Sequence, residues 1–314
     1  MPALAALRAG YPGARLALVG NPAASRLLQS AGYVDEAHSF DARWVTDLYS
    51  GEATDDLRAR LAEVDLAVVW SRSPESPAVE SLRRLGIPTL AAPSFPPPGV
   101  RRHLCDHLLG TLAPLGLPAV APIPRLTVPD ADRAFARDFW RANAIDAIDG
   151  ATVVALHVGS GSPRKNWPAE RFAAVADRLA ERGIRVLLVS GPADEAQADA
   201  FLRSTRNRVL VAESPRLGEL AALLARADAY LGNDSGVSHL AAAVGTPTVA
   251  IFGPTDPALW APRGPRVIVL WRGEAWTAGS EPPGEVSEQL LGTIDQVGVE
   301  SALVALGLLL DRGA

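Results

Sequence analysis

A stretch rich in glycine and serine stands where a predicted strand gives way to a predicted helix. It reads Gly159-Ser160-Gly161-Ser162 and is followed by Lys165. Such a turn exposes backbone N–H groups beside the positive end of a helix, which favours a bound phosphate. The stretch lacks the Gly-Lys-Ser/Thr of a P-loop and the third glycine of a dinucleotide fingerprint. We therefore predict an anion site here, with a merely tight turn as the alternative.

A second polar cluster, residues 232–239 with the sequence GNDSGVSH, also joins a predicted strand to a predicted helix. Asp234, Ser235 and His239 are the residue types of a serine hydrolase, but they lie on one local turn and lack the Gly-X-Ser-X-Gly elbow. The amides at this helix entry could instead hold a phosphate or a sugar hydroxyl, with His239 one helical turn further on. Alternatively, Asp234 and Ser235 simply cap the helix.

The charge composition favours a local anion site over a nucleic-acid surface. The net charge is −5, whereas proteins that wrap nucleic acid neutralise many phosphates with Lys and Arg. Lys165 is the only lysine among the 30 Lys and Arg residues. Because a compact ammonium and a planar guanidinium are not interchangeable, this lysine is a candidate functional residue.

Predicted strands and helices alternate along both halves of the chain, which implies parallel sheets covered by helices on both faces. Because 314 residues exceed the usual size of one core, we expect two domains. Prolines crowd residues 113–130 and predict the passage between the domains. We place the domains at residues 1–130 and 131–285, followed by a helical segment at 286–314.

The predicted strands position both polar clusters. They are expected at residues 15–19, 66–70 and 88–91 in the first half and at 152–157, 185–190, 209–211, 229–231 and 248–252 in the second. Ligands of doubly wound sheets bind beyond the carboxyl ends of the strands. Both clusters follow such ends, so we expect them to share one site.

Four motifs, in this order, resemble the heptosyltransferase family, which is glycosyltransferase family 9. They are residues 156–168 (LHVGSGSPRKNWP), 191–195 (GPADE), 233–239 (NDSGVSH) and 252–257 (FGPTDP). The resemblance implies an α/β fold of the GT-B type, with two Rossmann-like doubly wound parallel-sheet domains and a central cleft. Residues 1–130 would then bind the acceptor, 131–285 would bind the nucleotide-sugar, and 286–314 would pack back on the N-terminal domain.

The resemblance also implies a function. Family members move a heptose from an ADP-sugar to the growing core of lipopolysaccharide, so we expect a nucleotide-sugar donor and a glycolipid or glycan acceptor. The implied donor-binding set is Ser160, Gly161, Ser162, Lys165, Glu195, Asp234, Ser235, Gly236 and His239. Within it, Lys165 and Asp234 are the implied catalytic residues, and Glu195 would hold the nucleotide ribose. A lysine and helix-end amides stabilise the charge that develops on a departing diphosphate, and this scheme requires no metal or other cofactor.

The start of the chain departs from the family pattern. The first strand and its Gly-Asp turn, which carries the presumed general base, have no counterpart, because Met1 stands where the first helix has begun. A parallel sheet without that central strand would lose ladder partners on both sides. We expect either a start upstream of Met1 or a lost base, and no motif nominates Asp35 or Asp41 instead.

Two other classes of function compete with this one. A catalytically impaired nucleotide or nucleotide-sugar binding protein of the same fold is the main alternative. An NAD-dependent oxidoreductase is disfavoured by the missing fingerprint glycine and the missing ribose acid. The sequence has no signal peptide and no run of about 18 apolar residues. We expect a cytoplasmic protein, which a lipid-linked acceptor would bring to the inner face of the membrane.

Overall fold

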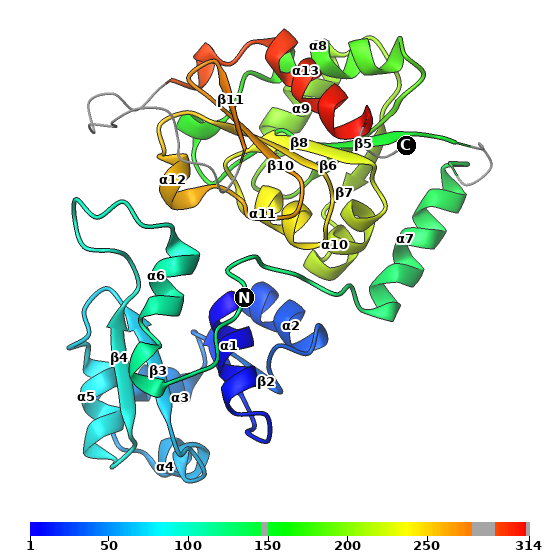
Figure 1. The fold of residues 1–314 in the computed structure, drawn as a ribbon. Helices are drawn as coiled ribbons and strands as arrows, with labels where there is room; N and C mark the ends of the chain where they lie inside the picture. The colour runs from blue at the N-terminus through cyan, green and yellow to red at the C-terminus, as the bar shows by residue number, and fades with distance from the viewer. Residues whose placement is uncertain (146–149, 278–292, 312–314) are drawn as a thin grey trace. The chain divides into compact units, whose positions relative to one another are not determined.

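The computed structural model describes residues 1–145, 150–277 and 293–311. The chain divides into two compact units, Met1–Pro122 and Ile123–Ala314. Both units alternate strands with helices, as the sequence predicts (Figure 1).

The division between the units lies inside the proline-rich passage but before the expected boundary at residue 130. The reason is that residues 123–129 are anchored on the second unit. The amide of Leu126 donates a hydrogen bond of 2.8 Å to the carbonyl oxygen of Ala243. The side chains of Leu126 and Val128 are also buried.

The second unit is built on a seven-stranded sheet with the order β11-β10-β9-β8-β5-β6-β7. Its strands are β5 (Val153–His157), β6 (Arg185–Ser190), β7 (Leu210–Glu213), β8 (Ala229–Asn233), β9 (Thr248–Phe252), β10 (Val267–Trp271) and β11 (Glu274–Thr277). Neighbouring strands are parallel except for the antiparallel pair β10 and β11. Every residue of β5, β8 and β9 is buried, as expected for a parallel sheet covered on both faces.

Helices cover both faces of this sheet (Figure 1). They are α7 (Asp130–Ala142), α8 (Ala169–Ala180), α9 (Glu195–Ser204), α10 (Leu217–Ala225), α11 (Gly236–Ala243), α12 (Pro257–Trp260) and α13 (Val299–Leu310). One apolar core joins side chains of β5, β6, β8 and β9 to those of α8, α9 and α13. Helices α10 and α11 lie on the other face, where α7 packs against α10. Over the described ranges, no helix is long and apolar enough to cross a membrane.

The C-terminal helix α13 packs on the sheet of the second unit. That the segment 286–314 also packs back on the N-terminal domain stays a prediction. Helices α8 and α9 contact β6, whereas α13 contacts β8, β9, β10 and β11. Without α13, the apolar side chains on this part of the sheet would face water. Ala302, Leu303 and Leu306 therefore enter the core of the second unit. Residues 286–292 and 312–314 of the predicted segment lie outside the described residues.

The first unit contains two parallel pairs of strands. Its elements are α1 (Pro2–Gly10), β1 (Ala17–Gly20), α2 (Pro22–Ser30), β2 (Glu36–Ser39), α3 (Arg43–Ser50), α4 (Asp55–Leu61), β3 (Ala67–Ser71), α5 (Pro77–Arg84), β4 (Thr89–Pro93) and α6 (Leu104–Gly110). Strand β1 pairs with β2, and β3 pairs with β4. Ala67 and Val69 of β3 pack in one apolar cluster with α3 and α5, while Val68 and Trp70 pack in another with α1.

This arrangement differs from the single doubly wound sheet that we expected for the first unit. Within the described residues, β1 and β3 do not pair with each other, so the two pairs form separate two-stranded sheets. Both pairs still contribute apolar side chains to the same clusters, since Val19 of β1 packs with Ala67 and Val69.

The packing of α13 predicts how two truncations to alanine on one helix differ in their effect on stability. Leu306 is fully buried, whereas Val304 is 62% exposed. Leu306→Ala should lower the free energy of unfolding by about 2–5 kcal/mol because it leaves a cavity. Val304→Ala should change it by less than about 0.5 kcal/mol. Urea unfolding of both variants tests this, and similar losses in the two would contradict the burial of this face.

Candidate functional site

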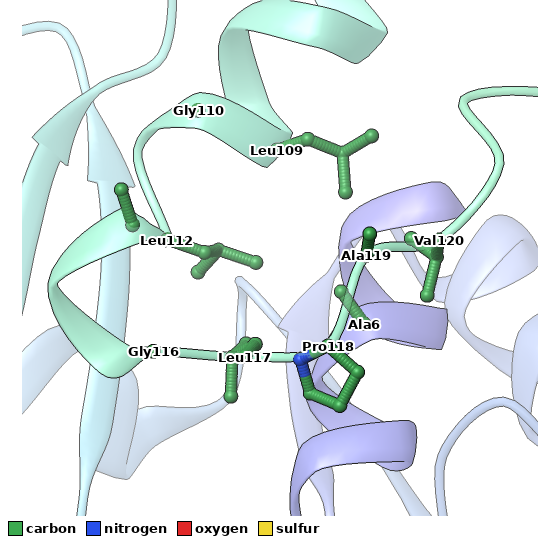
Figure 2. A pocket seen from close by; sticks show the side chains of 10 residues that line it. Ala6, Leu109, Gly110, Leu112, Gly116, Leu117, Pro118, Ala119 and Val120 are labelled. Carbon is green, nitrogen blue, oxygen red and sulfur yellow. The ribbon is translucent and has the colours of Figure 1, made fainter.

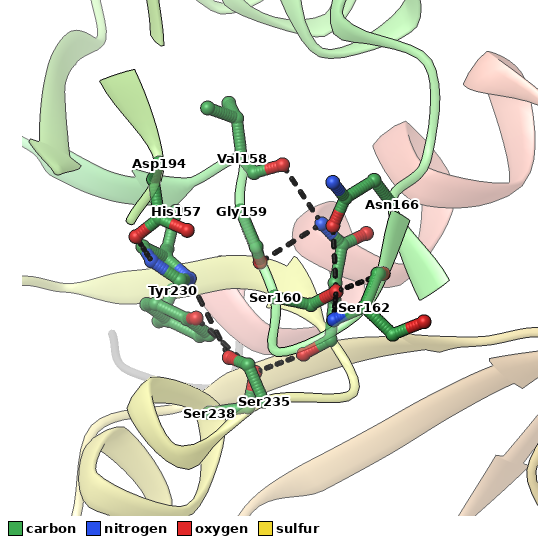
Figure 3. A network of polar contacts seen from close by, with 11 residues as sticks. His157, Val158, Gly159, Ser160, Ser162, Asn166, Asp194, Tyr230, Ser235 and Ser238 are labelled. Atoms are coloured by element: carbon green, nitrogen blue, oxygen red, sulfur yellow. Dashed lines mark hydrogen bonds and ion pairs between the residues drawn. The ribbon is translucent and has the colours of Figure 1, made fainter. Parts of the chain in front are cut away.

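The two predicted polar clusters meet at the carboxyl ends of neighbouring strands. In the sheet, β5 lies between β6 and β8, so the segments that follow these three strands share one edge. Figure 3 shows His157 at the end of β5, Asp194 after β6 and Ser235 after β8 pointing toward one another. The structure therefore brings together the glycine-rich turn and the 232–239 cluster.

A buried asparagine fixes the start and the end of the glycine-rich turn. The side-chain amide of Asn233 donates to the carbonyl oxygens of Val158 and Gly159 at 3.0 and 3.1 Å. Its Oδ1 accepts from the backbone amide of Trp167 at 2.9 Å. Asn233 is fully buried, so these bonds face no competition from water. Asn233 belongs to a motif quoted above but not to the implied donor-binding set.

The hydroxyl of Ser160 also makes polar contacts within the turn. Its hydroxyl lies 2.6 Å from Oδ1 of Asn166 and 2.7 Å from the carbonyl oxygen of Ser162. A short 3-10 turn at Pro163–Lys165 follows, before α8 begins at Ala169. Gly161 is exposed at the tip of the turn, with open space where a Cβ would stand. Backbone groups near this tip are therefore accessible to a ligand.

Lys165 and Asp234, the two implied catalytic residues, form an ion pair. Lys165 Nζ lies 2.7 Å from Asp234 Oδ2, and the side chains are 29% and 7% exposed. The hydroxyl of Thr255 donates to the same carboxylate oxygen at 2.7 Å. Asp234 thus holds the lysine at the site, and part of the lysine charge is balanced without a ligand. Thr255, which belongs to the 252–257 motif, was missing from the implied set.

A second acid pairs with a buried histidine beside the turn. His157 Nε2 lies 2.9 Å from Asp194 Oδ2, and Ser235 Oγ lies 3.4 Å from His157 Nδ1 (Figure 3). His157 and Asp194 are almost completely buried. A Cβ on Gly159 would overlap the Asp194 carboxylate, so glycine is needed there for this close approach. Neither His157 nor Asp194 was among the predicted site residues.

The entry of α11 is not capped by Ser235. Ser235 is the N-cap residue, but its side chain makes no capping hydrogen bond and faces His157 instead. The capping alternative therefore does not describe Ser235. First-turn amides of a helix carry partial positive charge and can bind an anion. Gly236 is exposed at this entry. Glu195, at the first position of α9, is also exposed.

His239 lies one turn into α11 in an environment that favours its neutral form. Burial lowers the pKa of His239, the positive charge of Lys165 adds to this effect, and Asp234 opposes it. At neutral pH this imidazole is therefore an uncharged hydrogen-bonding group.

A separate cavity lies in the first unit. It has a volume of about 310 Å³ and is lined by α1 and by the segment around residues 109–120 (Figure 2). Its lining consists of Ala6, Leu109, Gly110, Leu112, Ala113, Gly116, Leu117, Pro118, Ala119 and Val120. These side chains carry no charged or hydrogen-bonding group. Among the described residues, no group of three or more His, Cys, Asp or Glu could hold a metal ion.

The three hydrogen bonds of Asn233 predict that a small change in its side chain lowers the stability of the protein. In Asn233→Asp the shape is kept, but an oxygen replaces the amide that donates to two carbonyl oxygens. Loss of these bonds should cost about 1–3 kcal/mol of unfolding free energy, measured by urea denaturation. Asn207→Ala, which removes an exposed amide that donates to Asp177, is the matched control and should cost less. If Asn233→Asp were as stable as the wild type, these hydrogen bonds would not stabilise the turn.

The lowered pKa of His239 predicts acid sensitivity. An unfolded-state histidine, with a pKa of about 6.5, takes up a proton before the folded one does. The unfolded state then binds more protons, so the free energy of unfolding falls as the pH drops below about 6.5. His239→Gln should lose this contribution and show a shallower decline between pH 7.5 and 5.5 in urea titrations. If His239→Gln lost stability with falling pH as steeply as the wild type, the lowered pKa of His239 would be contradicted.

The chain is similar to known proteins. The model of a family described as glycosyltransferase family 9 (heptosyltransferase) matches residues 98–281. Lipopolysaccharide heptosyltransferase 3 of Escherichia coli K12 is 31% identical over 178 residues, which cover 54% of this chain and 50% of that protein. The chain thus spans about half the length of this curated relative.

Two solved structures share the fold. The chain matches the glycosyl transferase family 9 protein from Veillonella parvula with a TM-score of 0.81, at 21% identity over 99% of this chain and 92% of that one. It matches E. coli ADP-heptose lps heptosyltransferase II with a TM-score of 0.72, at 20% identity over 99% and 94%. The fold is therefore α/β of the GT-B type. Because the family model covers more than half of the chain, including the glycine-rich turn and the 232–239 cluster, the chain belongs to glycosyltransferase family 9.

Proposed function

We propose that this chain is a glycosyltransferase that moves a heptose from an ADP-linked donor to a lipopolysaccharide-core acceptor. The observation that carries the proposal is the Lys165–Asp234 pair, which stands beside an exposed glycine-rich turn and the entry of α11. The names of the relatives support the sugar and the acceptor, since they are lipopolysaccharide heptosyltransferases. The name of one structural neighbour supports the ADP-heptose donor.

The second unit is the proposed donor-binding part of the enzyme. The diphosphate would bind against the turn at Ser160, Gly161 and Ser162 and against the α11 entry at Ser235 and Gly236. Helix-end amides favour an anion at the α11 entry, because α11 begins there without a side-chain cap. Neutral His239 would add a hydrogen bond within the first turn. Glu195, which is exposed at the start of α9, would hold the nucleotide ribose.

Catalysis would depend on the charge of Lys165. When the bond between the sugar and the diphosphate breaks, negative charge grows on the leaving oxygen, and a nearby ammonium group stabilises that charge. Asp234 accepts a hydrogen bond from Thr255 as well as from Lys165, so the acid stays anchored if the lysine shifts toward a phosphate. Asp234 would then face the donor sugar.

We also assign the binding of the acceptor to the first unit. A lipid-linked acceptor would bring the enzyme to the cytoplasmic face of the membrane as a peripheral protein. We assign no general base among the described residues. Transfer of heptose from ADP-heptose to a core acceptor would establish the activity, whereas nucleotide binding without transfer would favour the binding-protein alternative.

Calorimetric titration of ADP, UDP and GDP tests the donor site. We expect the wild type to prefer ADP. Lys165→Ala removes a hydrogen bond to a charged group and leaves Asp234 unpaired near the phosphates, so ADP binding should weaken roughly 10- to 100-fold. Arg164→Ala, which removes the exposed neighbouring charge, is the matched control and should bind ADP nearly as well as the wild type.

Two results would contradict the assignment of the donor site. One is equal affinity for the three nucleotides in the wild type, which would remove the preference for ADP. The other is equal weakening in Lys165→Ala and Arg164→Ala, which would mean that the net positive charge of the region, and not the position of Lys165, controls binding.

A further inference from the structure

The segment between β4 and α6 carries exposed apolar and basic side chains that the proposed donor site does not use. It spans residues 94–103, with the sequence SFPPPGVRRH, and runs as a long loop in Figure 1. We call these residues the proline loop. Phe95 and Val100 are both 46% exposed. Arg101 and Arg102 are exposed as well, so two apolar and two basic side chains face water on one short segment.

Hydrogen bonds hold the backbone of the proline loop in an ordered conformation. At its start, the amide of Ser94 donates to the carbonyl oxygen of Ser71 at 2.8 Å, which ties the loop to the end of β3. At its tip, the amide of Val100 donates to the carbonyl oxygen of Pro97 at 3.1 Å. This bond closes a turn with proline in its second position and Gly99 in its third, at a φ of 80°, as in a type II turn. The exposed side chains are therefore presented on an ordered backbone.

The proline loop presents few backbone donors to its surroundings. Residues 96–98 are prolines, which have no N–H group. The amides of Ser94 and Val100 are bonded as described, and that of Arg102 donates to the carbonyl oxygen of Val100 at 3.1 Å. Moving an unbonded N–H group from water into an apolar medium is costly. This loop can therefore enter the interface of a membrane at a lower cost than a loop of ordinary composition.

The proline loop is also basic, in a protein that is acidic as a whole. The chain has a net charge of −5, but residues 94–103 contain two arginines and no acid. The neighbouring loop after β3 adds one exposed charge of each sign, Arg72 and Glu75, and the first acid of α6 is Asp106. An anionic phospholipid surface attracts arginine side chains and repels acidic surfaces. The charge distribution therefore favours an approach with this loop first.

We propose that the proline loop docks the first unit on an anionic phospholipid membrane, with its two exposed apolar side chains in the interface and its two arginines against the headgroup phosphates. The two contributions add, because burial of apolar area and attraction to anionic lipid both stabilise a bound interfacial segment. This inference deepens the proposed function and rests on it for its purpose, since a lipid-linked acceptor would lie in such a membrane. The docking itself needs neither donor nor acceptor.

Co-sedimentation with lipid vesicles tests the docking. The wild type is mixed with vesicles of phosphatidylethanolamine and phosphatidylglycerol that hold no acceptor, and separately with vesicles of phosphatidylcholine alone. We expect binding to the anionic vesicles that weakens as salt is added, and much weaker binding to the neutral ones. The double variant Phe95→Ser/Val100→Ser should weaken binding to the anionic vesicles roughly tenfold. Arg101→Gln/Arg102→Gln should weaken it roughly 10- to 30-fold.

Matched control variants make the same kinds of change elsewhere on the surface. Val304→Ser/Leu308→Ser alters two apolar side chains of α13 that are 62% and 48% exposed. Arg203→Gln/Arg208→Gln removes two exposed arginines of the second unit, and so changes the net charge by the same amount. Both controls should bind the anionic vesicles like the wild type. Because all the altered side chains are exposed, the variants should fold, and urea unfolding checks this.

The outcomes separate the docking from the proposed function, because ADP is titrated into the same proteins. Loop variants that bind vesicles poorly but bind ADP like the wild type would support the docking. If the loop variants and the controls bind the vesicles alike, or if the wild type binds only vesicles that hold an acceptor, the docking of this loop on phospholipid is wrong. If the wild type binds ADP but no vesicle, the docking fails while the donor site stands. If it binds vesicles through the loop but not ADP, the proposed function fails and the docking stands.

Discussion

The buried side chain of Asn233 is the interaction on which the site depends. It is the last residue of β8, and its three hydrogen bonds hold the backbone at Val158, Gly159 and Trp167. A buried carbonyl or amide without a partner costs about 1–3 kcal/mol, so this one amide stabilises a turn that has no regular ladder of its own. With the turn fixed, Gly159 can approach Asp194 and Lys165 can reach Asp234.

The site then balances its charges in pairs. Lys165 pairs with Asp234, and His157 lies against Asp194. Burying an unpaired charge is costly, so the free protein satisfies each acid within the fold. Under the proposed function, a diphosphate would bring new negative charge into the same place, and Lys165 could shift toward it while Asp234 keeps its hydrogen bond from Thr255.

The sequence predicted the alternating elements and the meeting of the two polar clusters, but not the residues that hold them together. The sequence does not favour helix α3, because its Trp44, Val45 and Thr46 have low helix propensity and Ala42 offers no side-chain cap. It forms because Trp44, Val45 and Leu48 are buried in a cluster. Strand β8 was predicted to end two residues early, since glycine and asparagine are poor strand formers. Pairing of Asn233 with Ile251 extends it.

The hydrogen bond between His157 and Ser235 is longer than the bonds that Asn233 and Asp194 make. The contacts among the buried groups Asn233, His157 and Asp194 are between 2.9 and 3.1 Å, whereas the contact that leads outward, from His157 to Ser235, is 3.4 Å. A hydrogen bond near this length is weak, so Ser235 can change partners at little cost in free energy. An interior of close hydrogen bonds that ends in one loosely held hydroxyl would suit the proposed donor site, which would first hold a charged ligand and then release the product.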